Sequence, residues 1–98
     1  MPHVRLSARA QSDIYRLHTF LLGKDSNAAK RAVLAIREAF MPLKQSHMIG
    51  RPVEDYDDLR ELVIDFGATG YLALYRFEPS LNVVTILAIK RQREDGYK

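Results

Sequence analysis

Hydrophobic and polar residues follow two rhythms along this chain, one typical of helices and one typical of strands. Between residues 8 and 43, apolar side chains recur every three or four positions, the spacing that gathers them on one face of a helix. This spacing predicts one helix over Ala8–Leu22 and a second over Ala28–Met41. Ser7 is suited to cap the first helix, and the link between the helices is so short that they should form an antiparallel hairpin. The predicted buried stripes consist of Ala10, Ile14, Leu17 and Leu21, widened by Tyr15, His18 and Leu22, in the first helix, and of Ala29, Val33, Ile36, Phe40 and Leu43 in the second.

The remaining apolar runs favour strands. A short alternating run, His3–Ser7, precedes the first helix, and Leu59–Phe66 alternates apolar with mostly polar positions as a half-buried strand does. Two further runs, Tyr71–Phe77 and Val83–Lys90, are rich in aromatic and branched residues and are joined by a short loop with turn-forming residues. They predict an antiparallel hairpin at the end of the chain.

The connections complete the predicted fold. Pro42 should end the second helix, although the apolar phase continues at Leu43 and allows one further turn. The stretch Gln45–Asp58, with glycine, proline and a run of acidic residues, predicts a surface loop. We therefore expect one α+β domain over residues 1–98, with the order β-α-α-β-β-β. Its antiparallel sheet should carry the first strand at an edge and the helical hairpin packed on one face.

The composition of the chain excludes several classes of protein. The chain has 98 residues and no cysteine, so it has no disulfide framework and no thiolate for metal binding or nucleophilic attack. No stretch approaches the roughly 20 apolar residues of a membrane span, and the N-terminus lacks the apolar segment of a signal peptide. The histidines are far apart, without metal-ligand spacing. We expect a cytoplasmic protein with no membrane contact, no metal and no cofactor.

The distribution of charge makes the C-terminal segment a candidate for contact with a partner. The net charge of +3 and the pI of about 9.4 favour an acidic protein or a polyanion as partner. At Lys90 the sequence changes from apolar to charged, and Arg91, Arg93 and Tyr97 follow. A buried strand would hold these residues more firmly than a loose tail would, which makes them candidates for target contact. The alternative interpretation is a solvated terminus that only maintains solubility.

Several short segments occur in a particular order along the chain. They are Leu6-Ser7-Ala8-Arg9-Ala10, Gly50-Arg51-Pro52-Val53-Glu54, Leu59-Arg60-Glu61-Leu62-Val63-Ile64, Gly70-Tyr71 with Leu74-Tyr75-Arg76, and Ile89-Lys90-Arg91-Gln92-Arg93-Glu94 with Gly96-Tyr97. Taken together they resemble the RelE/ParE superfamily of bacterial type II toxins. The resemblance covers nearly the whole chain and depends on the order and spacing of the segments more than on any one of them.

The resemblance implies a growth-inhibiting toxin that a cognate antitoxin holds inactive, in a complex that binds its operator DNA. RelE-like members cleave mRNA in the ribosome, whereas ParE-like members inhibit DNA gyrase. A third alternative is a degenerate, non-toxic member that acts only in complex formation and repression. We expect a ParE-like protein, because RelE has an arginine where this chain has Gly67, and lysines where it has Val63 and Asp65.

The resemblance also assigns candidate site residues. RNA cleavage through the ribose 2′-hydroxyl needs a base, cations to stabilise the phosphorane, and an acid for the leaving oxygen. For a nuclease, the basic pair Arg91 and Arg93 and the C-terminal Tyr97 would be catalytic, with Glu61 or Asp65 as a possible base. Target-binding candidates are Lys90, Arg60 and Arg51.

Overall fold

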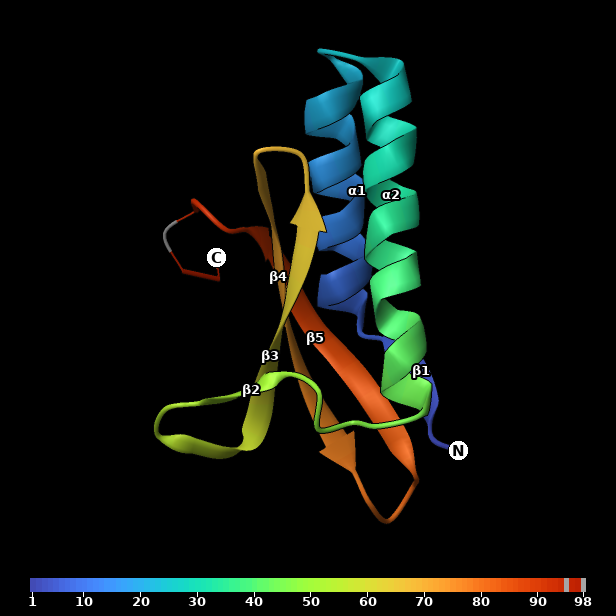
Figure 1. Ribbon diagram of the computed structural model, residues 1–98, viewed down its shortest axis with the longest axis vertical. Coiled ribbons are helices and arrows are strands. Elements are labelled where there is room, and N and C mark those ends of the chain that lie inside the picture. Colours follow the sequence, from blue (N-terminus) through green and yellow to red (C-terminus); the bar gives the residue numbers. More distant parts are fainter. Residues whose placement is uncertain (95, 98) are drawn as a thin grey trace.

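A sheet with two antiparallel helices on one of its faces makes up the fold, as the computed structural model shows for residues 1–94, 96 and 97 (Figure 1). Within this part of the chain, no helix is both long enough and apolar enough to cross a membrane. The elements are β1 (His3–Leu6), α1 (Ala8–Leu22), α2 (Ser26–Phe40), the 3₁₀ helix η1 (Met41–Lys44), β2 (Arg51–Val53), β3 (Tyr56–Phe66), β4 (Thr69–Glu78) and β5 (Val83–Arg91).

The strands lie in the order β1-β5-β4-β3-β2, which confirms the predicted α+β class and places β1 at an edge. The sheet is mixed rather than wholly antiparallel, because β1 runs parallel to β5 while the other neighbours are antiparallel. Chain direction explains the difference. The helical hairpin brings the chain back to the end where it started, so β3 runs in the direction of β1, β4 runs back, and β5 again follows β1 (Figure 1).

The predicted surface loop Gln45–Asp58 is partly wrong, because it contains β2 and the first residues of β3. The strand β2 is only three residues long, its register shifts between Pro52 and Val53, and it lies at the edge of the sheet. Proline lacks a backbone donor and is therefore tolerated at an edge position. The extra turn allowed after Pro42 is present as η1, with Leu43 fully buried.

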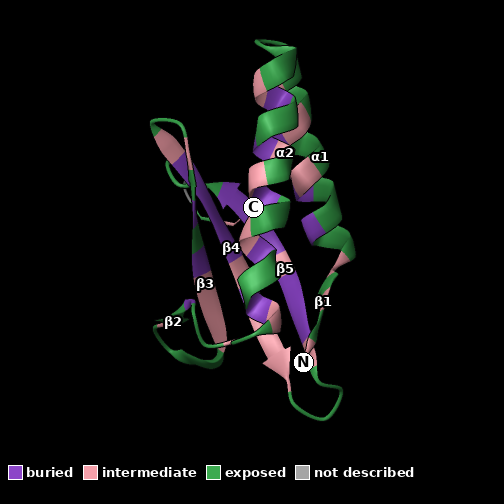
Figure 2. Ribbon diagram, turned by 45° about the vertical axis from the view of Figure 1, so that its right-hand side comes forward, coloured by how far each residue is buried: buried purple, intermediate pink, exposed green. Residues whose placement is uncertain are grey.

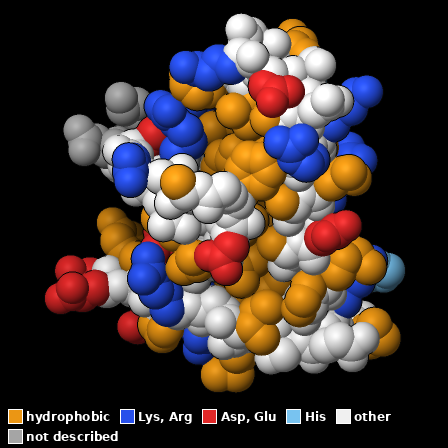
Figure 3. Space-filling view, turned by 45° about the horizontal axis from the view of Figure 1, so that its top comes forward, with side chains coloured by type: hydrophobic (Ala, Val, Ile, Leu, Met, Phe, Trp, Pro, Cys, Tyr) orange, Lys and Arg blue, Asp and Glu red, His pale blue; other side chains and the backbone are white. Residues whose placement is uncertain are grey.

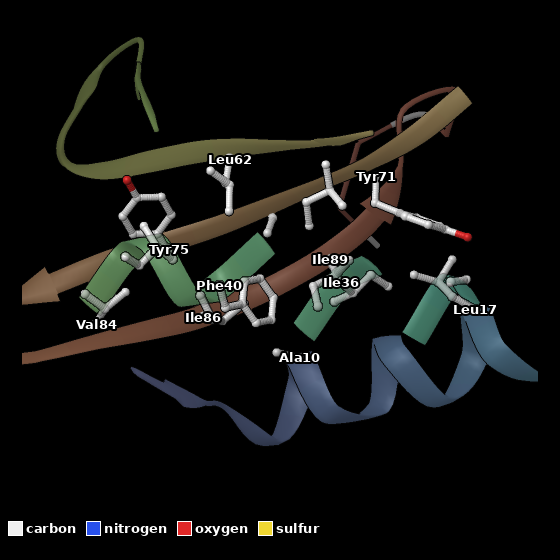
Figure 4. Close-up of a cluster of buried hydrophobic side chains, with 14 residues drawn as sticks. Ala10, Leu17, Ile36, Phe40, Leu62, Tyr71, Tyr75, Val84, Ile86 and Ile89 are labelled. Atoms are coloured by element: carbon white, nitrogen blue, oxygen red, sulfur yellow. The ribbon is translucent and has the colours of Figure 1, made fainter. Parts of the chain in front are cut away.

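The core fills the space between the helices and the sheet (Figure 4). Tyr75 of β4 and Ile36 of α2 are almost completely buried, and the helix faces turned away from the sheet are exposed (Figure 2). The predicted stripes are buried or partly buried throughout. Tyr15 and Leu22 were expected to widen the first stripe, but they are 73% and 51% exposed because they lie beyond its edge. Both helix starts carry side-chain caps, Ser7 as predicted and Asp25 for α2.

Candidate functional site

The helix α1 closes the part of β5 that β1 leaves unpaired. The pairing with β1 stops at Ile86, five residues before β5 ends. Beyond it, the hydroxyl of Ser7 donates to the carbonyl oxygen of Leu87 (3.0 Å), and the carboxylate of Asp13 accepts from the N–H of Ile89 (2.9 Å). Asp13 is buried, with 5% of its surface exposed, and lies between two arginines of α1, Arg9 at 3.2 Å and Arg16 at 3.8 Å. These contacts fix the C-terminal end of β5 against α1.

A turn after β5 folds back onto this end of the sheet. The carboxylate of Glu94 accepts from the backbone N–H of Arg91 (3.2 Å), from Nε of Arg91 (3.3 Å) and from Nη1 of Arg16 (3.0 Å). Burial alone would raise the pKa of the Glu94 carboxyl, but these hydrogen bonds and the neighbouring guanidinium charges outweigh it and lower that pKa. The ammonium group of Lys90 donates to the carbonyl oxygen of Glu94 (2.9 Å).

Arg91 stands between this turn and an apolar groove of about 230 Å³. Its guanidinium lies 4.6 Å from the centre of the Phe20 ring, and the ammonium group of Lys24 lies 5.0 Å from the same ring. Figure 3 faces this end of the molecule and shows hydrophobic side chains bordered by lysine and arginine. The lining residues are Leu17, Phe20 and Leu21 of α1, Phe66, Gly67, Ala68, Thr69 and Tyr71 around the β3–β4 turn, and Arg91.

Tyr97, Glu61 and Arg51 form a second charged group. The Tyr97 hydroxyl donates to one oxygen of the Glu61 carboxylate (2.8 Å), and the guanidinium of Arg51 donates to the other (2.6 Å). Burial, then the hydrogen bond to Glu61 and its charge, raise the pKa of Tyr97 well above the ordinary value of 10.0. The ammonium group of Lys90 lies 5.6 Å from the Tyr97 ring centre. Tyr97 is therefore held as a neutral hydrogen-bond donor.

The structure gathers most of the predicted site residues at one end of the sheet. Arg91, Lys90 and Tyr97 surround the C-terminal turn, and Arg51 joins them through Glu61. Lys90 is only 8% exposed, so its charge holds the turn rather than facing solvent. Arg93 is exposed. The remaining tail charges, Asp95 and Lys98, lie outside the described residues.

Arg60 is separate from this group. Its guanidinium donates to the carbonyl oxygens of Met48 (3.2 Å) and Gly50 (2.7 Å), which tie the loop before β2 to β3. Asp65 is exposed and points to the same side of β3 as Glu61, because the two are separated by an even number of positions. In the described part of the chain, no three histidine, aspartate or glutamate side chains are placed to hold a metal.

Sequence reasoning missed three contributors, Asp13, Arg16 and Glu94. A signal for the first was present, because Asp13 falls in phase with the buried positions Ala10 and Leu17. A carboxylate inside a buried stripe needs a partner, and arginines four positions before and three after it supply the charge. No sequence pattern indicates that Glu94 folds back onto Arg16, which lies 78 positions earlier.

Comparison with known proteins places this arrangement among bacterial toxins. Residues 4–96 match the family model described as the ParE toxin of the type II toxin–antitoxin system parDE. The chain is also 36% identical over 84 residues to Toxin RelE3 of Caulobacter vibrioides, which covers 86% of this chain and 89% of that protein.

Solved structures agree on the fold. The chromosomal ParDE toxin–antitoxin system of P. aeruginosa superposes with a TM-score of 0.78 at 24% identity, over 93% of this chain and 96% of that one. The intact RelBE toxin–antitoxin complex of E. coli gives a TM-score of 0.65 at 14% identity, over 96% and 100% of the two chains. At these identities the structural likeness supports the fold alone.

Proposed function

The chain belongs to the ParE toxin family of type II toxin–antitoxin systems, within the RelE/ParE superfamily, and from this premise we propose that it stops growth by binding DNA gyrase. The binding surface is the C-terminal end of β5 with the turn after it. In this proposal the protein acts by association, without cleaving a substrate. The basic side chains of the surface attract an acidic region of the target, and the neighbouring groove takes apolar side chains.

The observation that supports the choice of target is that Tyr97 and Glu61, two of the candidate nuclease residues, are bound to each other and to neighbouring charged groups. Tyr97 donates to Glu61, Glu61 also binds Arg51, and Lys90 holds the C-terminal turn. A general acid or base works best when its pKa lies near the working pH, and the pKa of Tyr97 is shifted away from it. Paired cations also stabilise a phosphorane less than open ones do. These features favour binding over RNA cleavage.

A supercoiling assay with purified gyrase tests this proposal. We expect the protein to inhibit supercoiling, and Arg91→Ala to weaken the inhibition by at least about tenfold, the effect of losing one important interface arginine. Arg37→Ala is the matched control, because Arg37 is an exposed arginine of α2 outside the proposed surface. Full gyrase activity at saturating protein would contradict the proposal.

A ribosome-dependent mRNA endonuclease is the second candidate. One observation favours it: Arg91 and Arg93, the basic pair that the resemblance assigns to a nuclease, are both exposed at the C-terminal end of β5. Toeprinting on translating ribosomes separates this candidate from the first. Cuts that the wild-type protein produces and the variant Arg91→Ala, Tyr97→Phe does not would favour the nuclease. The absence of cuts with the wild-type protein would exclude it.

We further propose that a cognate antitoxin neutralises the protein, as the toxin–antitoxin names of the similar structures suggest. Inducing the protein alone should stop DNA replication before translation, and co-expression of a small acidic protein encoded beside it should restore growth. Normal growth on induction alone would instead favour a non-toxic member that acts only in complex formation and operator repression.

A further inference from the structure

The carboxylate of Glu94 sits in a site built from groups that bind anions. One backbone N–H and two guanidinium groups, those of Arg91 and Arg16, donate to the same oxygen within 3.3 Å. The Glu94 side chain is only 10% exposed, although it lies four positions before the last residue of the chain. Hydrogen bonds from charged donors to a carboxylate are among the strongest in proteins. The site therefore selects an anionic oxygen and is already occupied.

The surroundings of this site remain cationic when Glu94 is counted. A cavity of about 470 Å³ between α1 and the turn is lined by three arginines, Arg9, Arg16 and Arg91, and by two acids, Asp13 and Glu94. Three positive and two negative charges leave +1, and withdrawal of Glu94 would leave +2. Asp13 is buried and pairs with Arg9 and Arg16, so it keeps both guanidinium groups in place whether or not Glu94 is present.

Glu94 can leave without disturbing the core. It lies in a short turn closed by its own N–H, which donates to the carbonyl oxygen of Arg91 (3.1 Å). Within the described part of the chain, the buried cluster extends only as far as Ile89. Displacement of the turn therefore breaks the hydrogen bonds and ion pairs of Glu94 and leaves the buried cluster intact.

We propose that Arg16, Arg91 and the Arg91 amide form a carboxylate-binding site for an acidic side chain of a partner protein, and that Glu94 occupies this site in the free protein. The partner's carboxylate replaces Glu94, and the released turn no longer covers Lys90. The inference deepens the proposed function by naming the chemistry of the partner's contact, and it depends on that function only in taking the partner to be a protein.

Two features favour a protein partner over a nucleic acid. The group that fits the site is a polypeptide carboxylate, as Glu94 demonstrates. The adjoining groove is lined by leucine, alanine and phenylalanine side chains, which suit an apolar residue next to the partner's acid. The exposed ring of this groove, Phe20, already has Arg91 and Lys24 over it, which leaves less of it for a base to stack on.

The test compares the wild-type chain with the variant Glu94→Ala in a titration with N-acetyl-glutamate α-amide, whose single carboxylate mimics a glutamate side chain. The backbone N–H of Arg91 and the Nε–H groups of Arg16 and Arg91 are followed by nuclear magnetic resonance at constant ionic strength. We expect a saturable chemical-shift change in Glu94→Ala, with a dissociation constant at least about tenfold lower than in the wild type. The reason is that the ligand no longer competes with the Glu94 carboxylate for the site. The double variant Glu94→Ala, Arg16→Ala should lose this gain.

Dimethyl phosphate, titrated in parallel, separates the two kinds of partner. Tighter binding of the phosphate diester than of the carboxylate would overturn the inference in favour of a nucleic-acid partner. Equal binding of the carboxylate by the wild type and by Glu94→Ala would show that Glu94 does not occupy the site. Glu94→Gln keeps the shape of the side chain without its charge and should show an intermediate gain. If Glu94→Ala does not fold, no gain in Glu94→Gln overturns the inference.

The carboxylate titration and the tests of the proposed function can fail separately. Growth arrest and gyrase inhibition are measured with the wild-type chain, so they can persist when the carboxylate titration fails, and the titration can succeed when gyrase is unaffected.

Discussion

At the scale of single residues, Gly50 and Tyr75 depend on each other. The Tyr75 side chain is completely buried, and its hydroxyl accepts from the N–H of Gly50 (2.8 Å) while donating to the carbonyl oxygen of His47 (2.6 Å). A Cβ atom at residue 50 would lie 2.6 Å from the Tyr75 ring and hydroxyl and 2.9 Å from the carbonyl oxygen of Glu61. Only glycine lets the loop before β2 approach the sheet this closely.

Gly50→Ala should lower the free energy of unfolding by about 1–3 kcal/mol, because neither the buried ring nor the backbone of β3 can move away without loss of packing. Gly23→Ala is the control. Gly23 has φ of −69°, which alanine adopts readily, and its nearest neighbour to a new Cβ is 3.8 Å away. Urea unfolding should leave this variant unchanged or slightly stabilised. Similar losses in both variants would refute the explanation.

Glu94 should make stability depend on pH in the acid range. Its pKa is lowered in the folded protein from the ordinary value of 4.5, so the folded state binds the proton less readily than the unfolded state does. The contribution is complete above the ordinary pKa and is lost as the pH falls through the lower folded value. The difference in unfolding free energy between wild type and Glu94→Gln should therefore be constant near neutral pH and shrink as the pH falls below the ordinary pKa of 4.5. A difference that does not change with pH would show that the charge contributes nothing.

At the scale of elements, α1 takes over the role of a neighbouring strand for the last part of β5. A free strand edge carries unpaired N–H and C=O groups, which is a liability in a folded protein. Here Ser7 and Asp13 bind Leu87 and Ile89 in turn, so a helix and a strand are joined by hydrogen bonds as well as by packing. The same contacts hold the end of β5 against α1 and so fix the position of Arg91, its last residue.

Asp13→Ala should lower the free energy of unfolding by about 1–3 kcal/mol, since it leaves the N–H of Ile89 buried without an acceptor. Asp13→Asn keeps a side-chain oxygen at that place and should lose less. Hydrogen exchange at the Ile89 amide, measured with urea unfolding, should be faster in the alanine variant than in the asparagine variant. A change below about 0.5 kcal/mol in Asp13→Ala, the range of ordinary surface substitutions, would contradict this role.

At the scale of the whole molecule, the layer of helices and the sheet make the core, and the candidate target surface lies at one end of it. The buried cluster draws on both helices and on β3, β4 and β5, and among the residues that the structure describes it includes none beyond Ile89. The buried core and the proposed target contact therefore belong to different parts of the chain. The turn after β5 contributes contacts at the surface, where they hold charged groups in position.

Removal of residues 92–98 should leave the protein folded, with a loss of about 1–2 kcal/mol, because the described residues of this segment contribute hydrogen bonds and ion pairs but no member of the buried hydrophobic cluster. Growth arrest on induction should be lost together with gyrase inhibition, since Arg93 and Tyr97 of the proposed surface are gone. Circular dichroism and urea unfolding monitor the fold while growth reports the function. A truncated chain that is unfolded, or one that still arrests growth fully, would refute this division.

The helices and four of the five strands were predictable because their signals are local. Ala10, Leu17, Ile36 and Phe40 recur at helical spacing, and each is buried as that spacing requires. The short strand β2 was not predictable, because three residues with a proline and a register shift carry almost no periodicity. It exists because β3 offers an edge to which Arg51 and Pro52 can pair.

The sequence by itself determined the α+β order, the faces of the helices, the basic end of the chain and the likeness to a toxin superfamily, since each depends on residues close together or on their order. Only the tertiary structure decided that Lys90 is buried, that Tyr97 binds Glu61, and that Glu94 lies between Arg16 and Arg91. These pairings join residues up to 78 positions apart, and a charged side chain finds such a partner only after the core has brought β5 against α1.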